Sequence, residues 1–267
     1  MLSGNEKESG GKNSGNKGGR IRAVIACVAA AIVGGALAGG AMAYFSDRDY
    51  GVNKLMIGNV QIEASEPGFP TKDENGDGVP DDCELVIPYE TITKDPRIRN
   101  TGNNDAVVFF KVTSPVEMLT LIDDSGTRHD EALEELFWFK QKGDSDGLHQ
   151  NNFNANWIRL TDLDGQIVDC EGINEEGQGY VYIFGYHTRI EPGETTATLF
   201  DKVQNKKYGS KTISANEKEI IRIEPYAIQA DDILRDGITV DTTGEISAED
   251  LSYIYQAFFN QNQEPLD

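Results

Sequence analysis

AVVFFKVT, at residues 106–113, is the strongest strand signal in the chain. β-Branched and aromatic residues fill it, and these residue types favour strands. Phe109 and Phe110 are adjacent. Because successive side chains of a strand point to opposite faces, both faces of this strand are expected to be buried.

Shorter strands are predicted on both sides of this segment. Gly and Pro residues separate them at intervals of about ten residues, which is typical of a β-sandwich. The predicted strands cover residues 55–62, 84–93, 156–160, 166–169, 179–186, 196–203 and 219–230. The sequence therefore predicts an all-β sandwich domain at residues 54–236.

One segment inside this domain has helical spacing. In DEALEELFWF, at residues 130–139, the side chains of Leu133, Leu136 and Phe137 fall on one side of a helix. Acidic residues occupy its first turn, where they favour a helix N-terminus. We therefore expect an accessory helix here.

A second helix is predicted in a C-terminal extension at residues 237–267. A capping-box-like start at Ser247 precedes apolar residues that recur at helical spacing over residues 248–260. We expect this amphipathic helix to pack on the sandwich; binding to a partner is the alternative.

The first 43 residues have the features of an export signal. Residues 1–22 are basic and rich in Gly, Ser and Asn, so they are expected to be disordered. Residues 23–43 carry no charge and end with Ala41 and Ala43 in an A-x-A cleavage site, which leaves Tyr44 as the first mature residue. A retained membrane anchor is the alternative, because 21 uncharged residues are enough to span a bilayer.

The mature chain is strongly acidic. The whole sequence has a net charge of −21, and the first 43 residues contribute +3, so the remainder carries −24. This charge argues against nucleic acid or an anionic membrane surface as a partner and favours divalent cations. Self-assembly would have to overcome the repulsion between like-charged copies.

An acidic loop, DENGDGVPDDCE at residues 73–84, matches the calcium-loop pattern D-x-[DN]-x-[DN]-G-x5-E in full. This spacing gathers side-chain oxygens around one cation, and the glycine at its sixth position permits the sharp turn. The expected ligands are Asp73, Asn75, Asp77, the Val79 carbonyl, Asp81 and Glu84. The alternative is a solvated acidic turn. No helices are predicted around it, and its wording resembles the calcium loops of thrombospondin type 3 repeats.

Two cysteines follow the predicted cleavage site. Cys83 and Cys170 permit one disulfide in an exported protein, or two buried thiols.

The remaining motifs indicate no enzyme. No G-x-S-x-G, phosphate-binding or dinucleotide-binding motif occurs. No H-E-x-x-H motif occurs either, so no zinc is expected. His129, His149 and His187 lie in unrelated contexts and are expected to be surface or loop residues.

Five patches in sequence order resemble the TasA/camelysin family. Members of this family are secreted proteins of Gram-positive bacteria, and a dedicated signal peptidase cuts their signal peptides. The patches are residues 43–47 with 57–60, residues 92–96, residues 100–102 with 106–112, residues 191–196 with Leu199, Phe200 and Val203, and residues 226–230.

This resemblance implies a jelly-roll-like sandwich with an extracellular or cell-surface role, led by fibre formation in a biofilm matrix. It also implies that an N-terminal arm of one subunit adds as a strand to the next subunit or to a related fibre protein. We expect the arm at residues 44–53, with Tyr44, Phe45 and Tyr50 as its contacts. The acidic loop and the C-terminal extension depart from short family members.

Two other functions stay open. One is a calcium-dependent surface adhesin or binding module. The other is a secreted metallopeptidase, because camelysins have been described as such; the absence of a zinc motif disfavours it.

Overall fold

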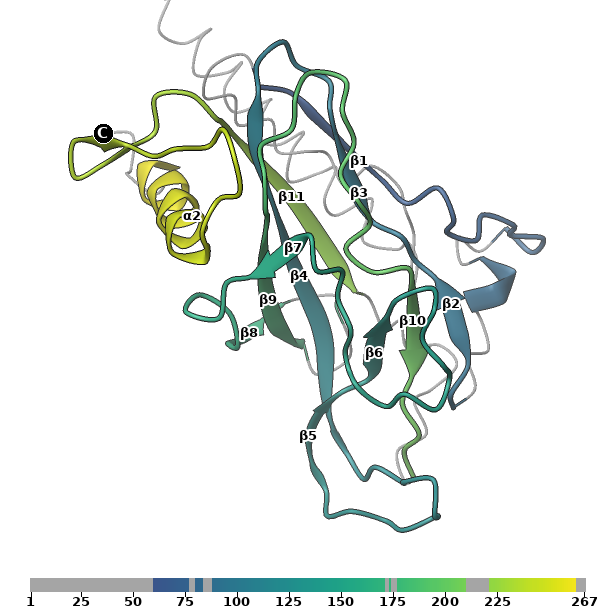
Figure 1. Cartoon of the computed structure of the whole chain (residues 1–267). Helices are drawn as coiled ribbons and strands as arrows, with labels where there is room; N and C mark the ends of the chain where they lie inside the picture. Colours follow the sequence, from purple (N-terminus) through teal and green to yellow (C-terminus); the bar gives the residue numbers. More distant parts are fainter. Residues whose placement is uncertain are drawn as a thin grey trace, which may run out of the picture. The chain divides into compact units, whose positions relative to one another are not determined.

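The computed structural model is an all-β sandwich with one C-terminal α-helix (Figure 1). It describes residues 60–76, 80–83, 88–170, 173, 177–209 and 221–262, which all belong to one unit, Met42–Asp267. The predicted all-β sandwich is confirmed.

The larger sheet is antiparallel and has the strand order β11-β4-β9-β7, with two short strands attached. β5 pairs with the C-terminal end of β4, and β8 pairs with the N-terminal end of β9. The bounds are β4 Ala106–Leu119, β5 Ala132–Glu135, β7 Trp157–Arg159, β8 Ile167–Asp169, β9 Gln178–Tyr186 and β11 Arg222–Gln229.

The opposite layer consists of two smaller antiparallel sheets. One has the order β2-β10-β6, and the other is the pair β1-β3. Their bounds are β1 Ile62–Ser65, β2 Thr91–Thr93, β3 Arg97–Asn100, β6 Phe137–Lys140 and β10 Lys202–Asn205.

A 3-10 turn, a short hairpin and one α-helix complete the described elements. A 3-10 turn, η1 Asp81–Cys83, follows the acidic loop. β12 Leu234–Arg235 and β13 Ile238–Thr239 form a hairpin whose turn residues, Asp236 and Gly237, have φ of 52° and 80°. Two positive φ values in a two-residue turn suit the right-handed twist of a hairpin. The helix α2 spans Ala248–Asn262.

β4 is buried on both faces, as its sequence predicts. Val108 and Phe110 belong to the main core between the two layers. Val107 and Phe109 belong to a second core between the larger sheet and α2. The adjacent phenylalanines thus serve two different hydrophobic cores.

The predicted C-terminal helix is also confirmed, and it packs on the outer face of the larger sheet. Ser247 caps it: its Oγ accepts from Asp250 N at 3.1 Å and donates to Asp250 Oδ2 at 2.8 Å. Leu251 and Ile254 are fully buried against the sheet. Gly185 of β9 permits this approach, because a Cβ there would lie 3.0 Å from both Leu251 methyl carbons.

The helix predicted at residues 130–139 is wrong. The segment forms β5 and β6, and the chain changes sheet at Leu136 between them. Phe137 and Phe139 alternate into the main core with the period of a strand. Leu133 instead faces Met118 across β4 and β5 and is 38% exposed. The unusual length of β4 supplies the edge that draws residues 132–135 into a sheet.

Strand boundaries also differ from the sequence prediction. The described part of the first strand begins only at Ile62, and the strand predicted at residues 196–203 forms only from Lys202 onward as β10. Residues 194–199 instead bond to β3 in isolated contacts, such as Thr196 N to Ile98 O at 2.8 Å.

The disulfide between Cys83 and Cys170 is not formed. Both are free and buried. Cys83 packs in the main core, whereas Cys170 packs with Ile173 in a separate small cluster. Burial raises the pKa of both thiols, and that of Cys83 to about 12.

Candidate functional site

The acidic loop is anchored at its base to the sandwich. Phe69 is buried in the main core, and Gly68 N donates to Asp95 Oδ1 at 2.8 Å. Lys94 Nζ pairs with Glu66 Oε2 at 2.7 Å, and both side chains are nearly inaccessible to solvent. These contacts fix the chain just before the loop to the body of the sandwich.

Inside the loop, the carboxylates already organise the backbone. Asp73 Oδ1 accepts from Gly76 N at 2.7 Å, and Gly76 has a φ of 74°. Asp81 Oδ1 accepts from Glu74 N at 2.9 Å, while Asp81 N donates to Lys72 O at 2.8 Å. These bonds hold Asp81, the ninth position, against Lys72 and Glu74, and these three residues form the stem of the loop.

A lysine serves as counter-ion at this stem. Lys72 Nζ lies 2.6 Å from Glu74 Oε1 and 3.5 Å from Asp81 Oδ2. The hydrogen bond to Glu74 raises the pKa of Lys72. The predicted ligands Asp73, Asn75 and Asp81 are among the described residues. Asp77, Val79 and Glu84 lie outside them, and in the described part no group of three or more potential ligand side chains could hold a metal ion.

Two patches of the family resemblance, residues 100–102 and 191–196, meet at one corner of the sandwich. Asn100, fully buried, donates from Nδ2 to Asn104 O at 2.8 Å and to Ile190 O at 3.0 Å, and its Oδ1 accepts from Gly102 N at 2.9 Å. Its backbone N donates to Glu194 O. These motif residues therefore hold turns together, which is a structural role.

β11 provides a long strand edge. Its eight residues pair with β4 on one side, and none of the strands in the described part of the chain pairs with the other side. Ala230 N, which continues this register, donates to Asp105 O at 2.9 Å. Because backbone groups alternate between the two edges, Ile223, Pro225 and Ala227 face away from β4. Pro225 thus costs the β4 ladder no hydrogen bond.

β1, the first described strand, lies close to β11. The two strands approach each other to within 8 Å between Cα atoms. The chain therefore enters the sandwich next to β11. The predicted cleavage site (Ala41, Ala43, Tyr44) and the predicted arm contacts (Tyr44, Phe45, Tyr50) lie outside the described residues.

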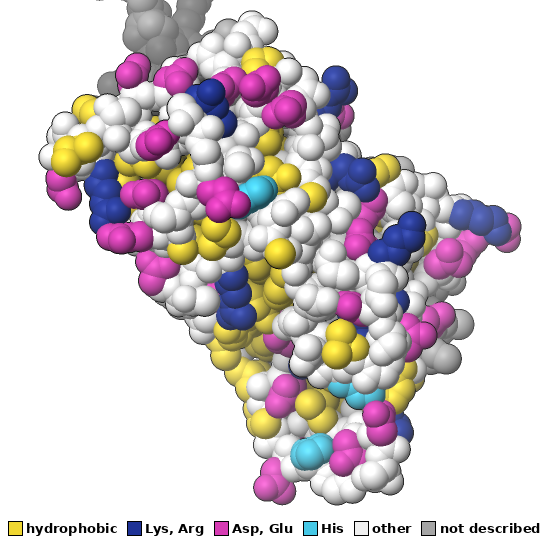
Figure 2. Space-filling view, viewed as in Figure 1, with side chains coloured by type: hydrophobic (Ala, Val, Ile, Leu, Met, Phe, Trp, Pro, Cys, Tyr) yellow, Lys and Arg dark blue, Asp and Glu magenta, His cyan; other side chains and the backbone are white. Residues whose placement is uncertain are grey.

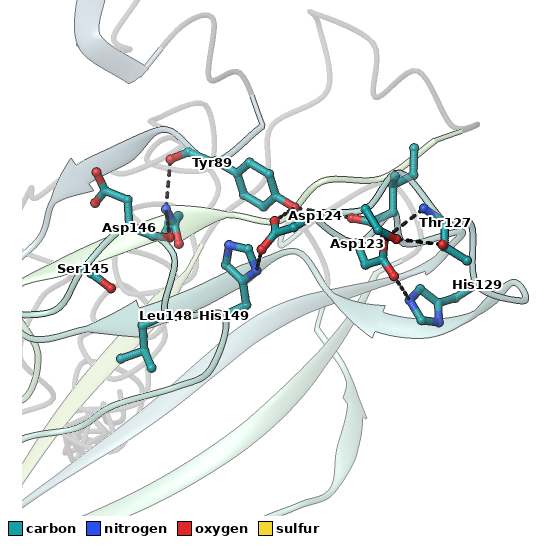
Figure 3. A network of polar contacts seen from close by, with 12 residues as sticks. Tyr89, Asp123, Asp124, Thr127, His129, Ser145, Asp146, Leu148 and His149 are labelled. Atoms are coloured by element: carbon teal, nitrogen blue, oxygen red, sulfur yellow. Dashed lines mark hydrogen bonds and ion pairs between the residues drawn. The ribbon is translucent and has the colours of Figure 1, made fainter.

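The structure brings two of the three histidines to the same end of the molecule (Figure 3), which the sequence does not predict. The ring of His149 stacks on both Tyr89, at 4.7 Å, and Trp138, at 4.8 Å, and the centroids of these two rings are 6.3 Å apart. His149 Nδ1 lies 3.4 Å from Asp124 Oδ2, and Tyr89 OH donates to Asp124 Oδ1 at 3.0 Å. The stack therefore joins the loops that carry Tyr89 and His149 to Trp138 of β6.

A second pair of a histidine and an aspartate lies in the neighbouring turn. His129 Nε2 is 3.9 Å from Asp123 Oδ2. Hydrogen bonds from the Ser125 hydroxyl and the Thr127 backbone lower the pKa of Asp123. His187 lies elsewhere, 3.9 Å from Glu245. Sequence spacing gives no signal for this arrangement, because loops about twenty residues apart meet only after folding.

Comparison with known proteins identifies no relative of this chain. No protein-family model, no curated protein and no solved structure matches the chain. Within the described ranges, no helix combines the length and the apolar content needed to cross a membrane.

Proposed function

We propose that this chain is a secreted structural protein that assembles into extracellular fibres or biofilm matrix by N-terminal strand addition. The arm at residues 44–53 of one copy, or of a related fibre subunit, pairs with the open edge of β11 in the next copy. The eight-residue edge of β11 is the observation that carries this proposal. No catalytic residue is needed for this role.

The geometry of the edge suits an incoming strand. Ile223 and Ala227 direct backbone N–H groups outward, and unpaired edges of this kind are templates for strand pairing. The arm has ten residues and β11 has eight, so the two have comparable extended lengths. Main-chain hydrogen bonds would supply affinity, while Tyr44, Phe45 and Tyr50 would supply apolar contacts.

Charge must be neutralised for such assembly. Figure 2 shows acidic side chains spread over the visible face, with basic side chains between them. Calcium at the acidic loop, held by the six ligands predicted from Asp73 to Glu84, would remove negative charge from each subunit. The proposed fibre is therefore calcium-modulated, and signal peptidase is the partner during export.

The decisive experiment compares residues 44–267 with residues 54–267 by electron microscopy, with and without calcium. Fibres are expected from the longer chain alone, and more of them with calcium. Equal fibre formation by the shorter chain would refute strand addition by the arm. Monomers of the longer chain that bind glycans or proteins only with calcium would favour the adhesin instead.

A further inference from the structure

Glu135 lies at the corner where the chain passes from one layer of the sandwich to the other. It is the last residue of β5, and β6 begins two residues later. Leu136 fixes the corner to both layers, because its N donates to Pro115 O at 3.3 Å and its O accepts from Lys206 N at 2.8 Å. A change in the charge of Glu135 therefore acts where the two layers of the sandwich are joined.

A chain of hydrogen bonds runs from Glu135 through the interior. Tyr182 OH donates to Glu135 Oε2 at 2.7 Å, and Asn151 Nδ2 donates to Tyr182 OH at 2.8 Å. Asn151 Oδ1 in turn accepts from Phe139 N at 3.0 Å. The chain joins β5, β9 and β6, so the carboxyl group is tied to both layers.

The carboxyl group is poorly compensated as an anion. Its Oε1 atom is inaccessible to solvent and has no hydrogen-bond partner within the described residues. The groups that face it are the hydroxyls of Tyr182 on β9 and Ser114 on β4, the amide of Asn151, and the more remote charge of Lys206. The Lys206 ammonium pairs instead with Glu134, at 3.6 Å. Burial outweighs these contacts and raises the pKa of Glu135.

β5 depends on this corner because it has little other support. It pairs with β4 beyond the segment that β9 and β11 cover, and in the described chain no strand lies on its other edge (Figure 1). Residues 124–133, which lead into it, are all exposed. The opposite side of the loop is held separately, by Ile122 N to Lys207 O at 2.9 Å.

We propose that Glu135 is a pH-sensitive latch that holds β5 and its loop against the body of the sandwich. With the carboxyl group neutral, the corner stays packed against Tyr182. Ionisation places an uncompensated charge in the interior and loosens β5 from the body.

The direction of the pH effect follows from linkage. An acid whose pKa is higher in the closed state binds protons more tightly there, so closure is favoured at low pH. That advantage is lost as the pH rises from the ordinary glutamate value of 4.5 through the raised pKa of Glu135. Within this interval each pH unit lowers protection of β5 amides by up to about tenfold.

Hydrogen exchange measured by mass spectrometry on the full chain tests the latch, from about pH 4.5 to about pH 8, with correction for intrinsic exchange. Peptides spanning residues 130–141 should lose protection as the pH rises, while peptides from β9 should not. Glu135→Gln keeps an acceptor for Tyr182 and should remove the pH dependence. The matched control Glu134→Gln should behave like the unaltered chain.

A second variant separates the latch from general instability. Tyr182→Phe removes a hydrogen bond that lowers the pKa of Glu135, so the loss of protection should still begin near pH 4.5 but continue to higher pH and become larger in total. A pH profile in Glu135→Gln identical to that of the unaltered chain would overturn the proposal. So would uniform protection of residues 130–141 across the whole range in the unaltered chain.

Discussion

At the scale of single residues, Asn100 shows how one side chain joins two segments of the chain. Its amide bonds to Gly102 N and Asn104 O within the turn that follows it, and to Ile190 O in a distant segment. Its side chain is completely buried, so water cannot replace these bonds. The motif at residues 100–102 is therefore explained by the hydrogen bonds between the Asn100 side chain and backbone groups.

Replacing Asn100 by Ala should lower the free energy of unfolding by about 3 kcal/mol, because several buried backbone groups lose their partner. Chemical denaturation measures this change. Asn103, exposed in the same turn, is the control, and its replacement by Ala should change stability by less than about 0.5 kcal/mol. Similar losses for both variants would contradict the role given to Asn100.

Substitution of Gly185 should likewise lower stability, through the second core. In Gly185→Ala the new Cβ would lie about 3.0 Å from Leu251 Cδ1 and 3.1 Å from Phe109 Cε1. Overpacking of this kind should cost about 1–3 kcal/mol and increase hydrogen exchange in α2. Gly244→Ala, where no heavy atom lies within 4 Å, is the matched control. Unchanged exchange in α2 would show that the helix accommodates the methyl group.

At the scale of elements, β11 carries the proposed assembly. Ala227→Pro removes an outward N–H group without removing a bond to β4, whereas Ala227→Val keeps that group. Fibre formation should be strongly reduced in the first variant and preserved in the second, as scored by electron microscopy on folded protein. Normal fibres from Ala227→Pro would place the acceptor edge elsewhere.

Elements with a single local period are predicted well from the sequence. AVVFFKVT and the helix after Ser247 are examples, since their own residues decide between strand and helix. DEALEELFWF is ambiguous, because its apolar residues fit one helix face and also the alternation of two short strands. Pairing with distant β4 and β10 decides the outcome.

The candidate sites divide in the same way. The acidic loop is visible as a contiguous motif, and its described bonds agree with a closed turn. The stack of Tyr89, His149 and Trp138 joins residues far apart in the chain, so no spacing rule finds it. The environment of Glu135 likewise depends on β9, which follows it by more than forty residues.

At the scale of the whole molecule, net charge bears on the proposed assembly. Residues 44–267 carry a net charge of −24, so copies repel one another at low ionic strength. Salt shortens the screening length from about 10 Å at 0.1 M to about 3 Å at 1 M, and assembly should accelerate accordingly. Light scattering follows this rate.

Calcium should accelerate assembly at concentrations far below those at which salt acts. Asp73→Ala should abolish the calcium effect and leave the salt effect intact, because it removes a ligand and only one charge. An equal calcium response in Asp73→Ala and the unaltered chain would mean that calcium acts only by general screening.

The position of α2 limits how subunits can grow together. Because this helix and the core beneath it cover the outer face of the larger sheet, two copies cannot stack sheet against sheet on that side. Addition at the β11 edge continues in one direction only. The expected product is a slender filament of uniform width, with lateral bundling left to other surfaces.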